Sequence, residues 1–242
     1  MTPQSRPVAV LVTRPAGQGD RFSAALQDRF GTDIRTVLSP LLAPAFLTPE
    51  WPDGPYSCLI LTSETGVEAA VRLRQTRALP DRAICVGDRT AHVARVHGFD
   101  TLSAQGDAEA LVSLVLAGAD AGPFLHLRGR EARGDIAPRL SEKGKPTRAV
   151  VVYEQNPLPL GSEARAVLDG QDSVIVPLFS PRTAEIFAAQ GPFAAPLRIA
   201  AISAPTAERV TALRPEAVAI AERPDAPAML DAIATLIPAP RA

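Results

Sequence analysis

Short runs of apolar residues recur along the chain, and each is followed by a polar turn. Val8–Val12, Cys58–Leu61 and 174–179 are continuous runs rich in branched side chains, which is typical of buried parallel strands. Similar but shorter runs lie between them. The predicted strands are 8–12, 34–38, 58–61, 83–86, 99–102, 124–127, 148–153, 174–179, 198–202 and 217–220.

Between these runs, apolar residues return at helical spacing. After the first run, Phe22 and Leu26 fall on one face of a predicted helix that Asp20 caps and that continues to about Arg29. Further along the chain, Asp107 is predicted to cap a helix that continues to about Ala117. Strands that alternate with helices of these lengths predict an α/β fold with mainly parallel sheets.

Two proline-rich passages interrupt the alternation. The passage 39–55 contains five prolines, and we interpret it as a loop between two lobes rather than as a strand or helix. The passage 156–161 is a second crossing point between the lobes.

The order of motifs repeats within the chain. LILTSETGVEAA resembles VPLFSPRTAEIF and pairs Ser63 with Ser180, whereas ICVGDRTAHVARV aligns with AAISAPTAERVTA and pairs Thr90 with Thr206. Arg14 in LVTRP matches Arg128 in LHLRG. The three offsets, 180 − 63 = 117, 206 − 90 = 116 and 128 − 14 = 114, are nearly constant, so we expect two lobes of similar topology.

Composition narrows the classes of function. A formal net charge of −1 gives no support to a nucleic-acid-binding surface or a polybasic membrane patch, so neither partner is expected. Cys58 and Cys85 lie in apolar contexts without CxxC spacing, which favours buried thiols in a reducing compartment. The amino terminus has no apolar run long enough for a secretion signal. We therefore expect a cytoplasmic protein.

Several catalytic and cofactor motifs are missing. The chain has no GxxxxGK[ST] phosphate loop, no GxGxxG turn after the first strand and no GxSxG elbow around Ser180. His92, His97 and His126 are not spaced as metal ligands, so no metal is expected.

Polar residues gather where predicted strands end, which is where open parallel sheets bind ligands. The stretch 124–155 places Arg128, Arg130 and Arg133 after one strand and Tyr153 at the end of the next. Guanidinium groups suit carboxylates or phosphates, and a phenol can donate a proton. Each serine or threonine in these turns is also explained by helix capping, and the arginines by solvation, which is our interpretation for Arg130.

The motifs VLVTRPAGQ, LTSETGVEAA, CVGDRTA, LRGREARGD with VVYEQ, FSPRTAEIF and ISAPTAERV occur in an order that resembles the uroporphyrinogen-III synthase family along nearly the whole chain. The resemblance implies two HemD-type α/β lobes joined by a two-stranded connector, with a cleft between them. Residues 1–36 and 157–242 would form one discontinuous lobe, and residues 37–156 the other.

The resemblance also implies the reaction. It is the cofactor-free dehydration and cyclisation of hydroxymethylbilane, with inversion of the last pyrrole ring through a spiro intermediate. Hydroxymethylbilane would be the small-molecule partner, and transient contact with the preceding or following enzyme of the pathway is also implied. Orientation of a flexible octa-carboxylate chain needs many carboxylate contacts and few reactive side chains.

Matching by motif assigns the site residues. Tyr153 would be the acid. The residues that would bind substrate carboxylates are Arg14, Ser63, Thr90, Arg128, Arg133, Ser180 and Thr206.

The chain departs from the family pattern at several positions. Ser203 replaces a glycine, Phe179 stands where a threonine is common, and Gly134-Asp135 replaces an acidic–apolar pair. Pro177 removes a ladder donor from its strand, so we expect that strand to be at an edge or bulged.

Two other functions remain open from sequence. The chain could be a non-catalytic two-lobe sensor of an acidic tetrapyrrole or another polycarboxylate, although no DNA-binding domain accompanies it. A periplasmic-type binding protein is disfavoured by the missing signal peptide.

Overall fold

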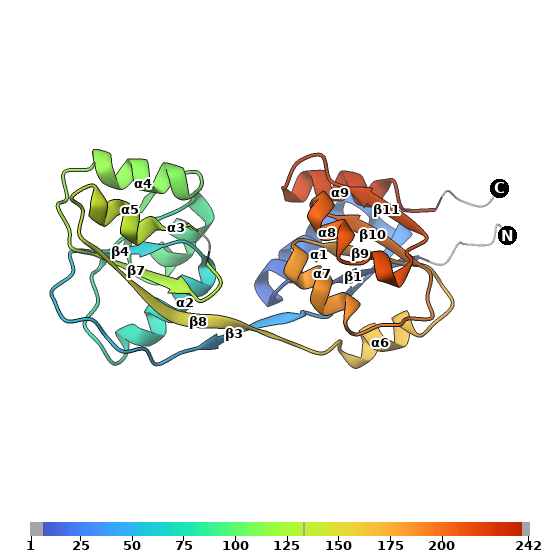
Figure 1. The fold of residues 1–242 in the computed structure, drawn as a ribbon. Coiled ribbons are helices and arrows are strands. Elements are labelled where there is room, and N and C mark those ends of the chain that lie inside the picture. Colours follow the sequence, from blue (N-terminus) through green and yellow to red (C-terminus); the bar gives the residue numbers. More distant parts are fainter. Residues whose placement is uncertain (1–6, 133, 239–242) are drawn as a thin grey trace. The chain divides into compact units, whose positions relative to one another are not determined.

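A computed structural model describes residues 7–132 and 134–238. It contains two sheets with helices on both faces (Figure 1), which confirms the predicted α/β class. The chain divides into two compact units. Unit 1 comprises the described residues within Met1–Ala43 and Pro157–Ala242, and unit 2 those within Pro44–Asn156. The chain passes from unit 1 to unit 2 after Ala43 and returns to unit 1 at Pro157.

Unit 1 has a five-stranded parallel sheet in the order β11-β10-β9-β1-β2. Its strands are β1 (Val8–Val12), β2 (Ile34–Leu38), β9 (Val174–Leu178), β10 (Leu197–Ala201) and β11 (Ala217–Ile220). Its helices are α1 (Ala16–Phe30), α6 (Ser162–Leu168), α7 (Pro181–Ala188), α8 (Ala204–Glu208) and α9 (Ala226–Ala234), with short 3₁₀ turns at Gly31–Asp33 and Thr211–Leu213.

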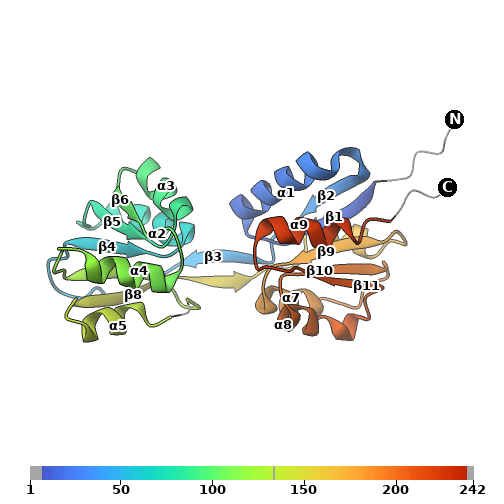
Figure 2. The same cartoon turned by 90° about the horizontal axis from the view of Figure 1, so that it is seen from above.

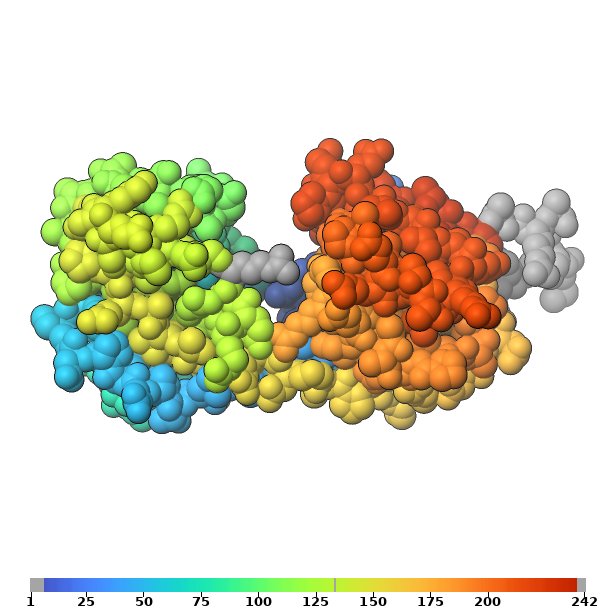
Figure 3. All heavy atoms as spheres, viewed as in Figure 1, coloured from blue at the N-terminus to red at the C-terminus, as the bar shows by residue number. Residues whose placement is uncertain are grey.

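The two faces of this sheet are covered by different helices. Val10 and Val12 of β1 point to one face and pack with Phe22 of α1 and Met229 of α9. The alternate residue Leu11 packs on the other face with the fully buried Phe187 of α7. This alternation is the two-residue period of a strand, and it explains why β1 is apolar at every position. Figure 2 shows α1 and α9 together on one face, and in Figure 3 the carboxyl-terminal segments, orange to red, cover the visible face of the unit.

Unit 2 is built in the same way around a sheet of order β3-β8-β7-β4-β5-β6. Its strands are β3 (Leu42–Phe46, which starts in unit 1), β4 (Cys58–Leu61), β5 (Arg82–Cys85), β6 (Asp100–Ser103), β7 (Phe124–Gly129) and β8 (Thr147–Pro157). Its helices are α2 (Glu64–Arg74), α3 (Asp88–Val96), α4 (Ala108–Ala117) and α5 (Ile136–Glu142). Leu59 and Leu127 pack with α2 and α3, whereas Ile60 and Phe124 pack with α4 and α5. None of the helices in the described parts of the chain is both long and apolar enough to cross a membrane.

The strand order confirms the internal repeat. In unit 2 the order β6-β5-β4-β7-β8 matches β11-β10-β9-β1-β2 of unit 1 strand for strand, with β4 in the place of β9 and β7 in the place of β1. The paired turns of the sequence therefore follow equivalent strands in the two units.

Three expectations about local structure were wrong, and the first two concern the proline-rich passage and Asp20. The proline-rich passage is not all loop, because it contains β3. The Leu47 amide donates to the Val152 carbonyl and the Leu158 amide to the Leu41 carbonyl, so β3 runs antiparallel to β8, its neighbour in the sheet. Asp20 does not cap α1, which begins at Ala16 directly after Pro15.

The expectation that the strand of Pro177 is at an edge or bulged was also wrong, because β9 is the central strand and pairs with β10 in unbroken register. The Val174 amide and the Leu178 carbonyl both bond towards β10, so the alternate residues of β9 face β1. The backbone nitrogen of Pro177, which has no hydrogen to donate, therefore faces β1. The ladder between β1 and β9 has already ended there, at the pair Val10–Ile175. The proline costs no hydrogen bond in that ladder.

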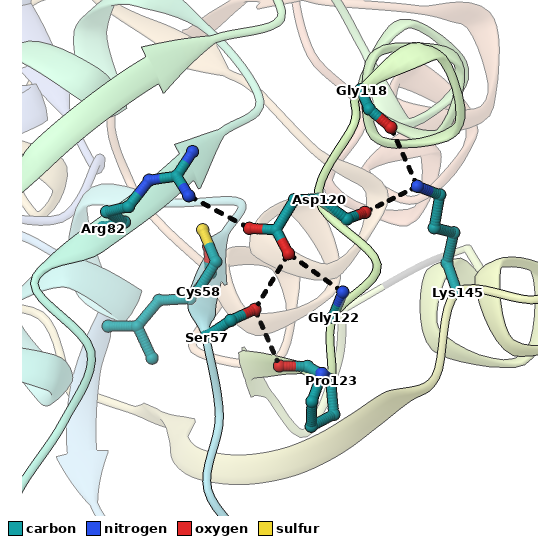
Figure 4. Close-up of polar contacts among 9 residues, drawn as sticks. Ser57, Cys58, Arg82, Gly118, Asp120, Gly122, Pro123 and Lys145 are labelled. Carbon is teal, nitrogen blue, oxygen red and sulfur yellow. Dashed lines mark hydrogen bonds and ion pairs between the residues drawn. The ribbon is translucent and has the colours of Figure 1, made fainter.

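A half-buried acid ties together the amino-terminal edge of the sheet in unit 2 (Figure 4). The Asp120 carboxylate accepts hydrogen bonds from Ser57 Oγ at 3.2 Å and the Gly122 amide at 2.9 Å, and it pairs with Arg82 at 3.1 Å. Lys145 donates to the carbonyls of Gly118 and Asp120. The end of α4 is thereby joined to the starts of β4, β5 and β8, at the edge opposite to the predicted site.

Candidate functional site

Tyr153 lies at the carboxyl-terminal edge of the sheet in unit 2. It is opposite Gly129 at the end of β7, where the ladder between β7 and β8 shifts register. Gly129 leaves no room for a side chain, because an added Cβ would be 2.6 Å from the phenol ring. The ring is therefore packed against backbone, only 8% exposed, with its hydroxyl at the strand end.

The hydroxyl of Tyr153 lies 2.9 Å from Ser63 Oγ, and either oxygen can be the donor. Ser63 is the amino-terminal cap of α2, and its Oγ accepts a hydrogen bond from the Gly66 amide at 2.9 Å. Capping fixes the serine in extended backbone and holds its side chain in one position. The helix start therefore positions the phenol's neighbour.

Burial raises the pKa of Tyr153 above its ordinary value of 10.0, and the Ser63 hydrogen bond opposes this shift. The phenol is thus neutral near pH 7 and carries a proton. It can act as a hydrogen-bond donor or as a weak acid at this strand end.

Arg128 turns back on its own loop. Its Nε donates to the Gly129 carbonyl at 3.2 Å, and its Nη2 makes a short contact with the Ala132 carbonyl. Next to it in β7, His126 is 2% exposed, with Nε2 3.5 Å from Thr62 Oγ1. Burial, and secondarily the Arg128 charge, lower the pKa of His126 to about 4, so this histidine is neutral. The neutral ring of His126 is therefore part of the buried interior near the end of β7.

Unit 1 has a pocket of about 470 Å³ at the equivalent edge of its sheet. Residues after β1, β9 and β10 and around the start of α9 form its walls, together with Leu42 of β3. Its polar lining consists of Thr13, Arg14, Gln18, Ser180, Thr183 and Asp225.

Ser180 has the same geometry as Ser63, its counterpart in the repeat. Its backbone angles, φ −162° and ψ 153°, match −159° and 157° at Ser63, and its Oγ accepts a hydrogen bond from the Thr183 amide at 3.1 Å. The partner of the hydroxyl differs, because Ser180 Oγ lies 2.9 Å from Thr183 Oγ1 instead of a phenol. The geometry of the helix cap is therefore repeated in the two units, but the partner of the serine hydroxyl is not.

Arg14 follows β1 and lies between two side chains. Its Nη2 donates to Gln18 Oε1 at 2.7 Å, and its guanidinium carbon is 4.0 Å from the centre of the Phe179 ring. The cation is therefore held at the pocket wall. Phe179, a departure from the family pattern, provides this aromatic face.

Thr90 and Thr206 lie inside the first turns of α3 and α8 and are buried. Thr206 Oγ1 lies 3.0 Å from Ser203 Oγ. Ser203 has φ −163° and ψ 162°, an extended conformation that any residue adopts, so the glycine of the family pattern is not required for this turn. The side chain replaces the glycine without backbone strain.

The structure brings together Ser63 and Tyr153 in unit 2, and Arg14 and Ser180 in unit 1. Arg133 lies outside the described residues. Arg130 forms an exposed ion pair with Glu154 at 2.7 Å, consistent with a solvated side chain. In the described ranges, no three histidine, cysteine, aspartate or glutamate side chains are grouped to hold a metal ion.

Sequence reasoning assigned no substrate contact to four polar residues of the unit 1 pocket: Thr13, Gln18, Thr183 and Asp225. The position of Thr13 between the β1 run and Arg14 was the available signal. Gln18 stands four residues after Arg14 in α1, at a spacing that brings helical side chains together. Thr183 stands three residues after its cap, where a capping partner is expected.

Comparisons with known proteins agree with this architecture. The structure of uroporphyrinogen-III synthetase from Helicobacter pylori 26695 matches 95% of this chain and 99% of its own, with 19% identity and a TM-score of 0.65. A mutant uroporphyrinogen III synthase from Thermus thermophilus matches 95% of this chain and 97% of its own, with 16% identity and a TM-score of 0.46. The first of these similarities supports the fold.

No curated protein matched the sequence. The model of the family described as uroporphyrinogen-III synthase HemD matches residues 20–231, which include both sheets apart from the first strand. This chain therefore belongs to the uroporphyrinogen-III synthase HemD family.

Proposed function

We propose that this protein catalyses the dehydration and cyclisation of hydroxymethylbilane to uroporphyrinogen III, with inversion of ring D, as a cyclising hydro-lyase of tetrapyrrole biosynthesis. Membership of the family over residues 20–231 carries the proposal. The buried phenol of Tyr153 beside Ser63 adds a group with chemistry suited to the first step.

That first step is loss of the substrate's hydroxyl group. The carbon–oxygen bond of the hydroxymethyl group breaks, and the oxygen leaves as water after gaining a proton. The pyrrole nitrogen supplies the electron density and loses its own proton, so that a neutral azafulvene forms and the proton given by the acid is replaced. Tyr153 is the proposed donor because its raised pKa keeps the phenol protonated near neutral pH. Ser63 can donate its own proton to the phenol oxygen and leave the phenol proton free for the substrate.

The second step is ring closure of the reactive azafulvene through the spiro intermediate. The protein's part is to hold the flexible tetrapyrrole so that the rearranged product forms faster than the unrearranged one. Arg14, Ser63, Arg128 and Ser180 are the proposed carboxylate contacts among the described residues, and Arg133 belongs to the same proposal from its motif. Arginines suit carboxylates through paired hydrogen bonds.

Thr90 and Thr206 are proposed on motif position. Because their hydroxyls are buried, substrate contacts from these two turns would come through backbone amides at the starts of α3 and α8. A cytoplasmic location and transient contact with neighbouring pathway enzymes belong to the same proposal. The buried free thiols of Cys58 and Cys85 suit a reducing compartment.

The test is the isomer ratio of the product. Purified protein is mixed with hydroxymethylbilane, and the uroporphyrinogens are oxidised and separated chromatographically. An excess of type III over type I is expected. A ratio equal to that of the protein-free control would exclude the function, and tight tetrapyrrole binding with that ratio would favour a sensor.

A further inference from the structure

The pocket of unit 1 contains a buried hydroxyl without a partner. Thr13 is 1% exposed, and among the described residues its Oγ1 has no hydrogen-bond partner. Thr13 also lines the pocket of about 470 Å³. Buried polar groups are nearly always paired, so an unpaired one beside a cavity points to a ligand group that completes it.

The guanidinium of Arg14, next to Thr13, is held in position by other side chains of the protein. The Arg14 guanidinium lies 4.0 Å from the Phe179 ring centre, and Gln18 accepts one of its hydrogen bonds at 2.7 Å. The Phe179 ring is itself fixed, because it meets Phe22 edge-on at 4.9 Å between ring centres. Phe22 is buried in the core of unit 1. The core therefore determines where the guanidinium lies.

Asp225 is the acid in the pocket lining, and its carboxylate is already bonded to other groups of unit 1. Asp225 caps α9, and its carboxylate accepts hydrogen bonds from the Ala228 amide at 2.8 Å and from Arg223 at 3.0 Å. The start of α7 adds amide groups next to Ser180, which also lines the pocket. The pocket thus favours an anion.

We propose that this pocket binds one carboxylate-bearing side chain of the substrate, through Arg14 and the Thr13 hydroxyl, and that Phe179 is the positioning residue that holds Arg14 in place. The inference rests on the proposed function for the identity of the substrate. The guanidinium and the hydroxyl both donate hydrogen bonds to the carboxylate. Phe179 touches Arg14 and acts on the substrate only through it.

The experiment measures KM and kcat for formation of the type III product, together with the affinity for uroporphyrin III, an octa-carboxylate that needs no turnover. Thr13→Val keeps the shape of the side chain and removes the hydroxyl. Loss of a hydrogen bond to a charged group predicts affinity lower by about tenfold or more. Phe179→Leu should raise KM about three- to fivefold, the size of a cation–π contact, with kcat within about twofold.

Three further variants separate positioning from packing. Phe179→Tyr keeps the aromatic face and should restore wild-type KM. In an Arg14→Gln background, Phe179→Leu should have no further effect on affinity. Phe30→Leu is the matched control, because Arg29 lies over that ring at 5.5 Å and neither residue lines the pocket. Unfolding midpoints are recorded for every variant.

Wild-type affinity in Thr13→Val would overturn the role of Thr13. An equal effect of Phe179→Leu with and without Arg14 would show that the ring acts through packing alone, and would overturn its positioning role. If the wild type makes no type III product, the proposed function fails. The uroporphyrin affinities then still decide whether the pocket binds a carboxylate.

Discussion

The phenol oxygen of Tyr153 lies 2.9 Å from Ser63 Oγ, and the same Oγ caps α2 by accepting a hydrogen bond from the Gly66 amide. Serine has only one proton, so the hydroxyl can donate it to Tyr153 while accepting from Gly66. In that arrangement the phenol proton is not used in the hydrogen bond with Ser63. One serine thereby links a helix start to the proposed acid.

Tyr153→Phe tests the acid directly. The substitution removes the hydroxyl and keeps the ring that packs on Gly129, so stability should fall by only about 1 kcal/mol. Turnover should fall about 100-fold, the lower end of the range for a general acid. Steady-state kinetics and urea unfolding measure the two effects. Tyr56→Phe, whose hydroxyl only makes 3.4 Å contacts with the backbone, is the control; retained turnover in Tyr153→Phe would leave dehydration to the substrate itself.

Gly129→Ala tests whether the position of the phenol matters. The new Cβ would be 2.6 to 2.9 Å from ring atoms and the hydroxyl of Tyr153, so the ring must shift from the position in which it meets Ser63. We expect kcat to fall about tenfold or more, because small displacements of reacting groups are costly. Gly17→Ala is the control, since its Cβ would meet nothing closer than 3.6 Å. An unchanged kcat for Gly129→Ala would show that catalysis tolerates a displaced ring.

The lowered pKa of His126 should make the free energy of unfolding depend on pH. The unfolded chain protonates this histidine below pH 6.5, whereas the folded protein keeps it neutral until about pH 4. Unfolding free energy should therefore fall as the pH drops from 6.5 to 4, by about 3 kcal/mol at most. Urea unfolding across this range measures the slope. His126→Asn should flatten it, whereas His92→Asn, on the exposed face of α3, should not; an identical slope in His126→Asn would assign the effect to other groups.

Substitution of Asp120 should lower the stability of the protein without lowering its activity. Its carboxylate is 21% exposed and has three partners, so Asp120→Ala leaves Ser57, Arg82 and the Gly122 amide without it. Unfolding free energy should fall by about 1–3 kcal/mol. The kcat should not change, because the network is at the opposite sheet edge from Tyr153. Asp81→Ala, which breaks an exposed pair with Arg74, should change stability by less than about 1 kcal/mol.

Sequence patterns were sufficient where structure is decided locally. Val8–Val12 and Cys58–Leu61 are strands as predicted, because every position is apolar and both faces of the sheet are covered. Asp107 caps α4 as predicted, through two backbone amides. These features depend on residues that are neighbours in the chain.

The rest depends on distant residues. β3 has half-buried residues throughout and a proline in its middle, and it is a strand because β8 lies beside it. The partner of Tyr153 is 90 residues away, and Phe179 meets Arg14 only when β9 joins β1 in the sheet. No local pattern carries such information, so the candidate site residues were found by motif and their contacts by structure.

The insertion of one unit into the other also fixes the order in which the sheets can form during synthesis. All strands of unit 2 are present once β8 ends at Pro157, whereas β1 cannot gain its second neighbour until β9 is made, from Val174 onward. Pairing between strands so distant in sequence is slow, and domains generally fold as they emerge. A growing chain will therefore present a folded unit 2 on an unfinished unit 1, and the last-made strands complete the pocket that holds Arg14.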